Sequence, residues 1–173
     1  MQVGKKVFVG LESGGKSLFM LRESVANIKR NSYWYKKTGI KRPIVGNLAW
    51  SKQFHDLAKK HGIEIRSWNN IEELPKLTEC DLYIDELQTY FDSRNFADLP
   101  LDVRLWLSQS TKMGVQIVGA TQDFGMCDKS FRRLCNKVYY VQKIIGSRRP
   151  MKTAPPVKTI WGIFFRWELD PRS

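Results

Sequence analysis

The sequence predicts an α/β fold, a three-layer sandwich in which helices cover both faces of a mostly parallel sheet. Two observations predict it: short apolar runs alternate with helical patterns, and a glycine-rich turn joins the first apolar run to the first helix. The 173 residues, 42% of them hydrophobic, have the length of one domain and can bury a full core. We expect a single domain over residues 1–173, with its core over about 3–145.

The first strand is expected at residues 6–10, where an apolar run leads into the glycine-rich turn. A helix should begin after this turn, at Ser17. Its apolar residues recur at helical spacing: Leu18, Leu21, Val25 and Ile28. The N-terminal part of the chain is therefore expected to form a strand, a loop and a helix.

Further apolar runs bounded by turn residues predict the other strands, at residues 43–48, 63–68, 82–85, 115–121 and 138–145. Helical patterns separate several of them, at residues 51–61, 103–113 and 129–136. Asp102 is expected to cap the N-terminus of the second of these helices, and Gly114 to end it. Strands that alternate with helices favour parallel pairing.

The C-terminal part of the chain differs from this pattern. Residues 146–158 should form a basic loop, because they contain four cationic residues, three prolines and no carboxylate. The last segment, residues 158–169, alternates less cleanly and is expected to form an antiparallel edge strand or a hairpin.

Neither a membrane span nor a secretory signal is expected. The apolar stretch at residues 160–165 is far shorter than the roughly 20 residues that a spanning helix needs, and the N-terminus leads directly into a strand. We expect the protein to stay in the cytoplasm. Cys80, Cys127 and Cys135 form neither a disulfide framework nor a common zinc-binding pattern, so they are expected to be reduced core thiols.

Residues 10–17 read Gly-Leu-Glu-Ser-Gly-Gly-Lys-Ser and match the pattern G-x-x-x-x-G-K-[ST] between a strand and a helix. Glycines let backbone amides point at a phosphate, and the helix N-terminus adds partial positive charge. The Lys16 ammonium can reach the β- and γ-phosphate oxygens, and the Ser17 hydroxyl can bind Mg²⁺. An ordinary glycine turn is the alternative, which the flanking elements disfavour. The residues expected to bind a triphosphate are Gly10, Ser13, Gly14, Gly15, Lys16, Ser17 and Leu18.

Two adjacent carboxylates, Asp85 and Glu86, end the strand expected at residues 82–85. Phosphoryl transfer needs neutralisation of charge by a metal and a positioned nucleophile. We expect Asp85 to hold Mg²⁺ through water and Glu86 to orient or deprotonate the attacking water. Such a pair is common on solvated loops, but the preceding phosphate loop favours the catalytic interpretation.

A polar amide, Gln122, follows the strand expected at residues 115–121. Ligands of open α/β sheets bind at the carboxyl ends of the strands, so Gln122 can hydrogen-bond the γ-phosphate or the attacking water. We interpret it as a sensor of the phosphate. The alternative is an ordinary Thr-Gln turn that starts the next loop.

Together, the segments 10–17, 82–94 and 112–122 resemble the FtsK/HerA superfamily of DNA-pumping ATPases, over residues 3 to about 141. The stretch Glu-Leu-Gln-Thr-Tyr-Phe-Asp-Ser-Arg is most similar to the genome-packaging ATPases of tailless membrane-containing viruses and to Zot-like assembly proteins of filamentous phages. The resemblance implies a RecA-like P-loop NTPase fold of the additional-strand catalytic-glutamate type. It also implies ATP and Mg²⁺ as cofactors, with Lys16 and Ser17 at the phosphate and metal, Asp85 on the metal, Glu86 as base and Gln122 as sensor.

The resemblance further implies a ring, commonly a hexamer, that threads DNA. In such rings an arginine before the sensor strand often reaches the nucleotide of the neighbouring subunit, but this chain has Lys112 there. An ammonium lacks the fork of a guanidinium. Arg104, Arg132 and Arg133 are therefore rival candidates, and each has a solvated helix face as its alternative.

The basic segment 29–42 contains six cations, no carboxylate and the triplet Tyr33-Trp34-Tyr35. Cations beside aromatic rings suit sequence-independent nucleic-acid binding, and the net charge of +12 favours it. The residues expected to contact DNA are Trp34, Lys36, Lys37, Lys41 and Arg42. A solvated charged face or core packing of the aromatic rings is the alternative.

The function hypothesis from the sequence is an ATPase that packages a viral genome by translocating DNA into a capsid. Viral capsid or membrane-vertex proteins are then expected partners, and the host cytoplasm, the virion or a capsid vertex the expected locations. A Zot-like export ATPase is the alternative with the same chemistry, although such proteins usually continue into a membrane span. A small-molecule kinase and a non-catalytic nucleic-acid-binding module remain alternatives of other classes.

Overall fold

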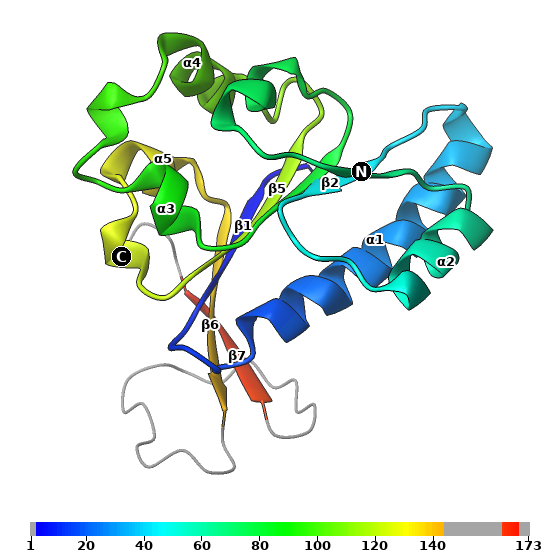
Figure 1. Ribbon diagram of the computed structural model, residues 1–173, viewed down its shortest axis with the longest axis horizontal. Helices are drawn as coiled ribbons and strands as arrows, with labels where there is room; N and C mark the ends of the chain where they lie inside the picture. Colours follow the sequence, from blue (N-terminus) through cyan, green and yellow to red (C-terminus); the bar gives the residue numbers. More distant parts are fainter. Residues whose placement is uncertain (1–2, 144–163, 170–173) are drawn as a thin grey trace.

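The computed structural model describes residues 3–143 and 164–169, which contain a seven-stranded sheet of order β3-β2-β4-β5-β1-β6-β7 (Figure 1). The strands are β1 (Lys5–Val9), β2 (Ile44–Gly46), β3 (Ile65–Ser67), β4 (Asp81–Ile84), β5 (Gln116–Thr121), β6 (Lys137–Lys143) and β7 (Phe164–Leu169). Every pairing is parallel except that of β6 with β7. The chain therefore has the predicted α/β fold with an antiparallel C-terminal edge.

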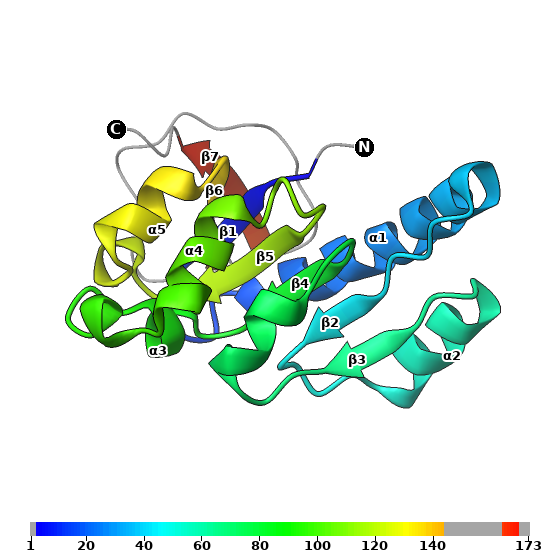
Figure 2. The same cartoon turned by 90° about the horizontal axis from the view of Figure 1, so that it is seen from above.

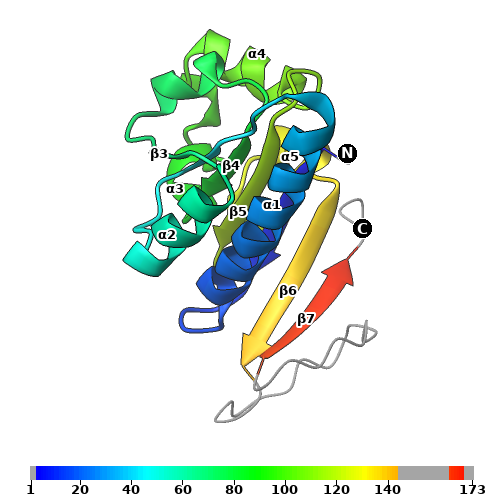
Figure 3. The same ribbon diagram turned by 90° about the vertical axis from the view of Figure 1, so that its right-hand side faces the viewer.

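Helices cover both faces of this sheet, with α1 and α2 on one face and α3, α4 and α5 on the other (Figure 2). Their bounds are α1 (Lys16–Thr38), α2 (Lys52–Lys60), α3 (Leu87–Phe91), α4 (Leu101–Gln109) and α5 (Lys129–Leu134). Three short 3₁₀ helices join them: η1 (Ile71–Lys76), η2 (Phe96–Asp98) and η3 (Phe124–Met126). Figure 3 shows α1 running along the strands in the direction opposite to β5 and β6.

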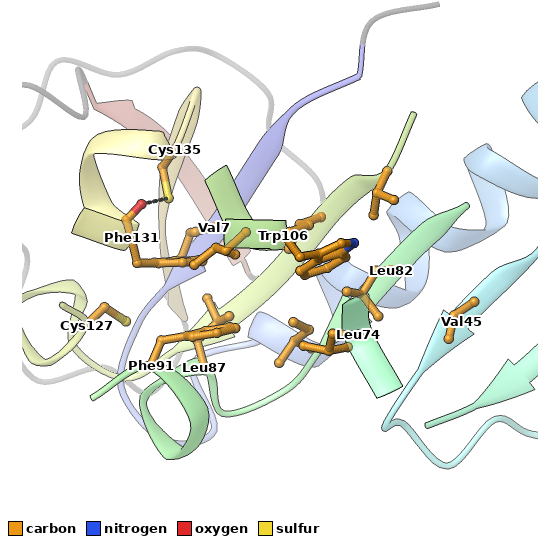
Figure 4. Packing of buried hydrophobic residues seen from close by; sticks show 14 of the residues in the cluster. Val7, Val45, Leu74, Leu82, Leu87, Phe91, Trp106, Cys127, Phe131 and Cys135 are labelled. Carbon is orange, nitrogen blue, oxygen red and sulfur yellow. Dashed lines mark hydrogen bonds between the residues drawn. The ribbon is translucent and has the colours of Figure 1, made fainter. Parts of the chain in front are cut away.

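The core consists of two apolar clusters, one on each face of the sheet. Strand alternation separates them: Leu82 of β4 packs beneath α3 to α5, and the next residue, Tyr83, packs beneath α1 and α2. In the first cluster Phe91 of α3 stacks on Phe131 of α5, with ring centroids 4.9 Å apart (Figure 4). These contacts fix the short helix α3, which directly follows Glu86.

The predicted strands and helices are present, with local differences. Helix α4 begins at Leu101 after Pro100, so the prediction that Asp102 caps it is wrong; the Asp102 carboxylate accepts a hydrogen bond from the Val103 amide at 2.9 Å. Proline at that position fixes a backbone angle that suits the start of a helix. Gly114, with φ of +73°, ends the turn after α4. The predicted basic loop at residues 146–158 lies outside the described residues.

Two further observations concern cysteines and membranes. Cys80, Cys127 and Cys135 are free and buried, and burial raises the pKa of the Cys127 thiol to about 11. They are core thiols, as predicted. Over residues 3–143 and 164–169, no helix is long and apolar enough to span a membrane.

Candidate nucleotide-binding site

The phosphate loop and the acidic pair lie at the same edge of the sheet. In the parallel register Val9 of β1 lies beside Thr121 of β5, and Gly119 of β5 lies beside Ile84 of β4. The residues that follow these strands therefore emerge at the carboxyl edge, where ligands of open α/β sheets bind. This edge brings the loop after Val9, the amide of Gln122 and the carboxylates after Ile84 into one region.

The phosphate loop requires glycine at two crowded positions. A Cβ atom on Gly10 would lie 2.3 Å from the Val141 carbonyl oxygen, and one on Gly14 would lie 2.7 Å from the Leu11 carbonyl oxygen. The loop is closed by a hydrogen bond of 3.0 Å from the Gly14 amide to the Leu11 carbonyl. Left-handed backbone at Ser13 and Gly15, with φ of 57° and 95°, turns the chain into α1. Such turns direct successive backbone amides to one side, as an anion site requires.

Lys16 is the first residue of α1, and only 7% of its surface is exposed. Its ammonium donates hydrogen bonds to the carbonyl oxygens of Gly10 at 2.8 Å and Leu11 at 3.0 Å. The charged group is thus held over the loop rather than in solvent. Ser17 and Leu18 are exposed in the first turn of α1, which contains no acidic side chain. The positive end of the helix dipole therefore faces the loop, with no carboxylate in the first turn of the helix itself.

Asp85 is half-buried at the end of β4, and Asn47, just after β2, holds its backbone. The Asn47 amide oxygen accepts from the Asp85 amide at 2.8 Å, and its nitrogen donates to the Asp85 carbonyl at 3.1 Å. Burial raises the pKa of the Asp85 carboxyl; the Glu86 amide, which donates to it, lowers the pKa, the Glu86 carboxylate raises it, and the Lys16 ammonium lowers it. Lys16 and Asp85 are therefore within electrostatic reach of each other.

Glu86 adopts left-handed backbone, with φ of 54° and ψ of 57°, directly before α3. This conformation is rare for a residue with a side chain and is concentrated at functional sites. The Glu86 amide donates to the Asp85 carboxylate at 3.0 Å, and the Gln88 side-chain amide donates to the Glu86 carboxylate. The two carboxylates therefore have different hydrogen-bond partners, as separate roles would require.

Gln122 is exposed directly after β5, at the same edge as the phosphate loop. The residue before it, Thr121, is fully buried, and the single proton of its hydroxyl has two acceptors within reach, the Gln88 amide oxygen at 2.7 Å and the Asp123 carbonyl at 3.0 Å. The strand end is thus tied down while the Gln122 amide stays accessible.

No family model matches this chain, and no curated protein matches it. Among solved structures, it is similar to the N-terminal domain of the zonular occludens toxin from Neisseria meningitidis, with a TM-score of 0.60 and 18% identity over 85% of this chain and 81% of that one. It is also similar to B204, the genome-packaging NTPase of Sulfolobus turreted icosahedral virus 2, solved in complex with AMPPCP, with a TM-score of 0.58 and 14% identity over 81% of this chain and 75% of that one.

The B204 DNA-packaging ATPase of Sulfolobus turreted icosahedral virus is a further match, with a TM-score of 0.59 and 12% identity over 81% of this chain and 76% of that one. The chain has the P-loop NTPase fold. These structures bear out, at the level of the fold, the resemblance to Zot-like and viral packaging ATPases.

The cationic candidates for a contact in trans are distributed over this P-loop NTPase fold. Lys112 is exposed in the turn before β5, at the opposite edge of the sheet from the phosphate loop. It therefore lies away from the phosphate loop of its own chain. Arg133 is exposed on α5, whereas Arg104 on α4 and Arg132 on α5 are half-buried.

The basic and aromatic residues of α1 lie toward its C-terminal end, from about 26 Å (Tyr33) to about 32 Å (Lys37) along the helix from Lys16 at 1.5 Å per residue. Lys36, Lys37 and Lys41 are exposed. The Lys37 ammonium lies 4.8 Å from the centre of the Tyr33 ring, and the Lys41 ammonium lies 5.5 Å from that of Tyr35. Trp34 is half-buried. We call the exposed residues Tyr33, Tyr35, Lys36, Lys37 and Lys41 the distal basic cluster.

Arg42 does not belong to this cluster, and its prediction as a DNA contact is wrong. Only 1% of its surface is exposed. Its guanidinium forms ion pairs with Glu79 at 2.7 Å and with the buried Asp81 at 3.0 Å, and donates to the Cys80 carbonyl at 3.0 Å. A charge buried in this way is paired inside the protein and is not accessible to a DNA phosphate.

Asn47, Gln88 and Thr121 are not among the residues predicted from the sequence. Asn47, just after β2, holds the backbone of Asp85, and Gln88 of α3 connects the Glu86 carboxylate to Thr121 of β5. No short motif identifies them. The sequence indicates such residues only as polar side chains at the end of a buried strand, and at the end of β5 this indication pointed to Gln122 and not to Thr121.

Proposed function

We propose that this protein hydrolyses ATP in the presence of Mg²⁺. The observation that carries the proposal is that the amide-lined loop ending in Lys16 and the carboxylates of Asp85 and Glu86 emerge at one edge of one sheet. The loop amides and the Lys16 ammonium would bind the phosphates, which replace the Gly10 and Leu11 carbonyls as partners of the ammonium. The Ser17 hydroxyl and the Asp85 carboxylate would hold Mg²⁺, which neutralises charge on the phosphate oxygens when bound.

Glu86 acts on the attacking water in this proposal. Its carboxylate orients the water and accepts its proton while the water oxygen bonds to the γ-phosphorus and the bond from that phosphorus to the β–γ bridging oxygen breaks. ADP and inorganic phosphate are the products. Gln122 lies at the right edge to donate a hydrogen bond to the γ-phosphate or to hold the water.

Two substitutions test these roles by separating binding from turnover. Lys16→Ala should abolish binding of a fluorescent ATP analogue, because it removes the cation at the loop. Glu86→Gln should retain binding and lose phosphate release, because an amide cannot accept the proton. Phosphate release by Glu86→Gln at the wild-type rate would contradict the proposal.

We further propose that hydrolysis drives the translocation of DNA. Two observations support this: the solved structure of similar fold from an icosahedral virus is a DNA-packaging ATPase, and the distal basic cluster presents cations beside aromatic rings. Such a surface neutralises backbone phosphates and stacks on bases or sugars without reading sequence. In a ring, a second copy of the chain would supply a basic residue that reaches the nucleotide of its neighbour. The candidates for this residue are Lys112, Arg104, Arg132 and Arg133.

The chain offers a matched control for the DNA surface. Lys36 and Lys37 in the last turn of α1 correspond to Lys59 and Lys60 in the last turn of α2, and both pairs are exposed. Lys36→Ala/Lys37→Ala should weaken DNA binding and reduce the dependence of the affinity on salt, whereas Lys59→Ala/Lys60→Ala should not. If both double variants weaken DNA binding equally, the distal basic cluster is not the DNA-binding site.

A Zot-like export ATPase is the second candidate, supported equally by the similarity to the toxin domain from Neisseria meningitidis. The chemistry is the same, so DNA-stimulated phosphate release would fit both candidates. A membrane span in the full-length gene product would favour the export ATPase. Phosphorylation of a small acceptor in place of free phosphate would indicate a kinase and contradict both candidates.

A further inference from the structure

Gln88 has a contact pattern that the proposed roles do not yet explain. It is the second residue of α3, half-buried, and both ends of its side-chain amide are engaged. The nitrogen donates to the Glu86 carboxylate, and the oxygen accepts from the Thr121 hydroxyl at 2.7 Å. A carboxylate can only accept, so the amide nitrogen must face Glu86 and the oxygen must face Thr121.

This amide connects two elements that separately carry proposed catalytic groups. Glu86 lies before α3, on the turn after β4, whereas Thr121 is the last residue of β5 and directly precedes Gln122. Strands β4 and β5 are neighbours, but their backbone pairing ends at Ile84 and Gly119. Beyond that point, the side chain of Gln88 continues the connection between the two strand ends.

A second contact holds α3 on the same strand. A Cβ atom on Gly119 would lie 2.4 Å from the nearest Leu87 carbon, so Leu87 rests directly on the backbone of β5. Leu87 is fully buried in the cluster that contains Phe91 and Phe131. Helix α3 has five residues and no side-chain cap, so its placement depends on such tertiary contacts. Leu87 fixes the helix, and Gln88 fixes the side chain that the helix presents to the site.

We propose that Gln88 is a positioning residue, which holds the Glu86 carboxylate in place and couples it, through Thr121, to the strand end that carries Gln122. This inference rests on the proposed ATP hydrolysis. Three rotatable side-chain bonds otherwise leave the Glu86 carboxylate free to sample positions from which it cannot reach the water. A displacement of about 1 Å of a catalytic group can cost about 100-fold in rate.

The coupling has a mechanistic consequence. A contact between Gln122 and the γ-phosphate moves or fixes the end of β5, and Thr121 is the adjacent residue. The hydroxyl of Thr121 and the amide of Gln88 transmit this position to Glu86. Sensing of the phosphate and activation of water are therefore carried by one connected set of side chains.

The test compares steady-state phosphate release and ATP-analogue binding for variants of the full chain with Mg²⁺. Gln88→Ala should lower kcat by about 10- to 100-fold, while KM and the affinity for the analogue stay within about twofold of wild type. Thr89→Ala is the matched control, because Thr89 is the next residue of the same helix and is exposed. It should leave kcat unchanged.

Thr121 gives a second, conservative comparison. Thr121→Ser keeps the hydroxyl and should retain turnover, whereas Thr121→Val keeps the shape, loses the hydroxyl and should lower kcat. The double variant Gln88→Ala/Thr121→Val should have a kcat little lower than that of Gln88→Ala alone, because both substitutions break the same connection.

The outcomes separate this inference from the proposed function. Turnover of Gln88→Ala within about twofold of wild type, with Glu86→Gln inactive, would overturn the role of Gln88 and leave the hydrolysis intact. If Gln88→Ala lowers the affinity for the analogue and the melting temperature together with kcat, the inference is also overturned, since such a pattern indicates a merely structural residue. Wild-type turnover by Glu86→Gln would overturn the proposed hydrolysis mechanism itself.

Discussion

Gly119→Ala is a small substitution for which the structure predicts a large effect. A Cβ atom at this position would lie 2.4, 2.6 and 2.8 Å from three carbons of the Leu87 side chain. Carbon atoms pack at about 3.5–4.0 Å, so the two groups must separate by about 1 Å. Leu87 is fully buried, so relief of the contact requires α3 to shift or the strand to bend. Either change displaces Glu86.

The magnitude follows from overpacking. An extra carbon in a well-packed core costs about 1–3 kcal/mol, which lowers the melting temperature of a domain of this size by about 2–12 °C. Turnover should fall by more than the loss of stability alone would cause, because the displaced helix directly follows Glu86, the proposed base. Thermal unfolding and phosphate release on the same preparation measure both effects.

Leu87→Ala provides the complementary perturbation. Alone, it should cost about 2–5 kcal/mol, because it leaves a cavity above Gly119. In combination with Gly119→Ala, the new methyl group fills part of that cavity, so the double variant should be more stable than the sum of the two losses predicts. Wild-type stability of Gly119→Ala, or strictly additive losses, would refute the contact between α3 and β5.

Three further predictions follow from other contacts. Arg42→Ala should lower the free energy of unfolding in urea by about 3–5 kcal/mol, because the buried Asp81 carboxylate loses the cation at 3.0 Å and keeps only Asn31 at 2.8 Å and Arg30 at 3.8 Å. Lys41→Ala at the exposed neighbouring position should change it by at most about 0.5 kcal/mol, and similar losses for the two variants would show that the ion pair is weak. Asp85→Asn should raise the melting temperature of the nucleotide-free protein at neutral pH. Burial raises the pKa of Asp85 in the folded state, so the protonated carboxyl contributes stability that is fully present below pH 3.8 and is lost as pH rises through the folded-state pKa. A gain that persists at pH 3 would contradict this cause. Gly10→Ala should abolish nucleotide binding, since its Cβ would lie 2.3 Å from a backbone oxygen that cannot move aside, and normal binding by this variant would contradict the loop geometry.

The parts of the fold that could be predicted from sequence are those with local causes. The phosphate loop is a contiguous motif, and the strands β1, β4 and β5 are apolar runs of nearly the observed length. Their alternation with helices is enough to favour parallel pairing at one edge. Asp85, Glu86 and Gln122 could be nominated because each follows such a strand directly.

The remaining features depend on contacts between distant residues. The partners of Arg42 are Glu79 and Asp81, 37 and 39 positions away, and a run of cations does not reveal which one turns inward. Helix α3 has five residues and no capping side chain, so neither periodicity nor a cap predicts it. Gln88 meets Thr121 only because the register of β4 and β5 brings their ends together.

The central claim is that the loop ending at Lys16 and the acidic turn at Asp85 and Glu86 serve one nucleotide. A crystal structure of the full chain with Mg²⁺ and a non-hydrolysable ATP analogue tests it most directly. The account predicts phosphates within the loop, Mg²⁺ between the Ser17 hydroxyl and the Asp85 carboxylate, and Glu86 facing the γ-phosphate. A nucleotide bound elsewhere, or a γ-phosphate out of reach of both carboxylates, would contradict it.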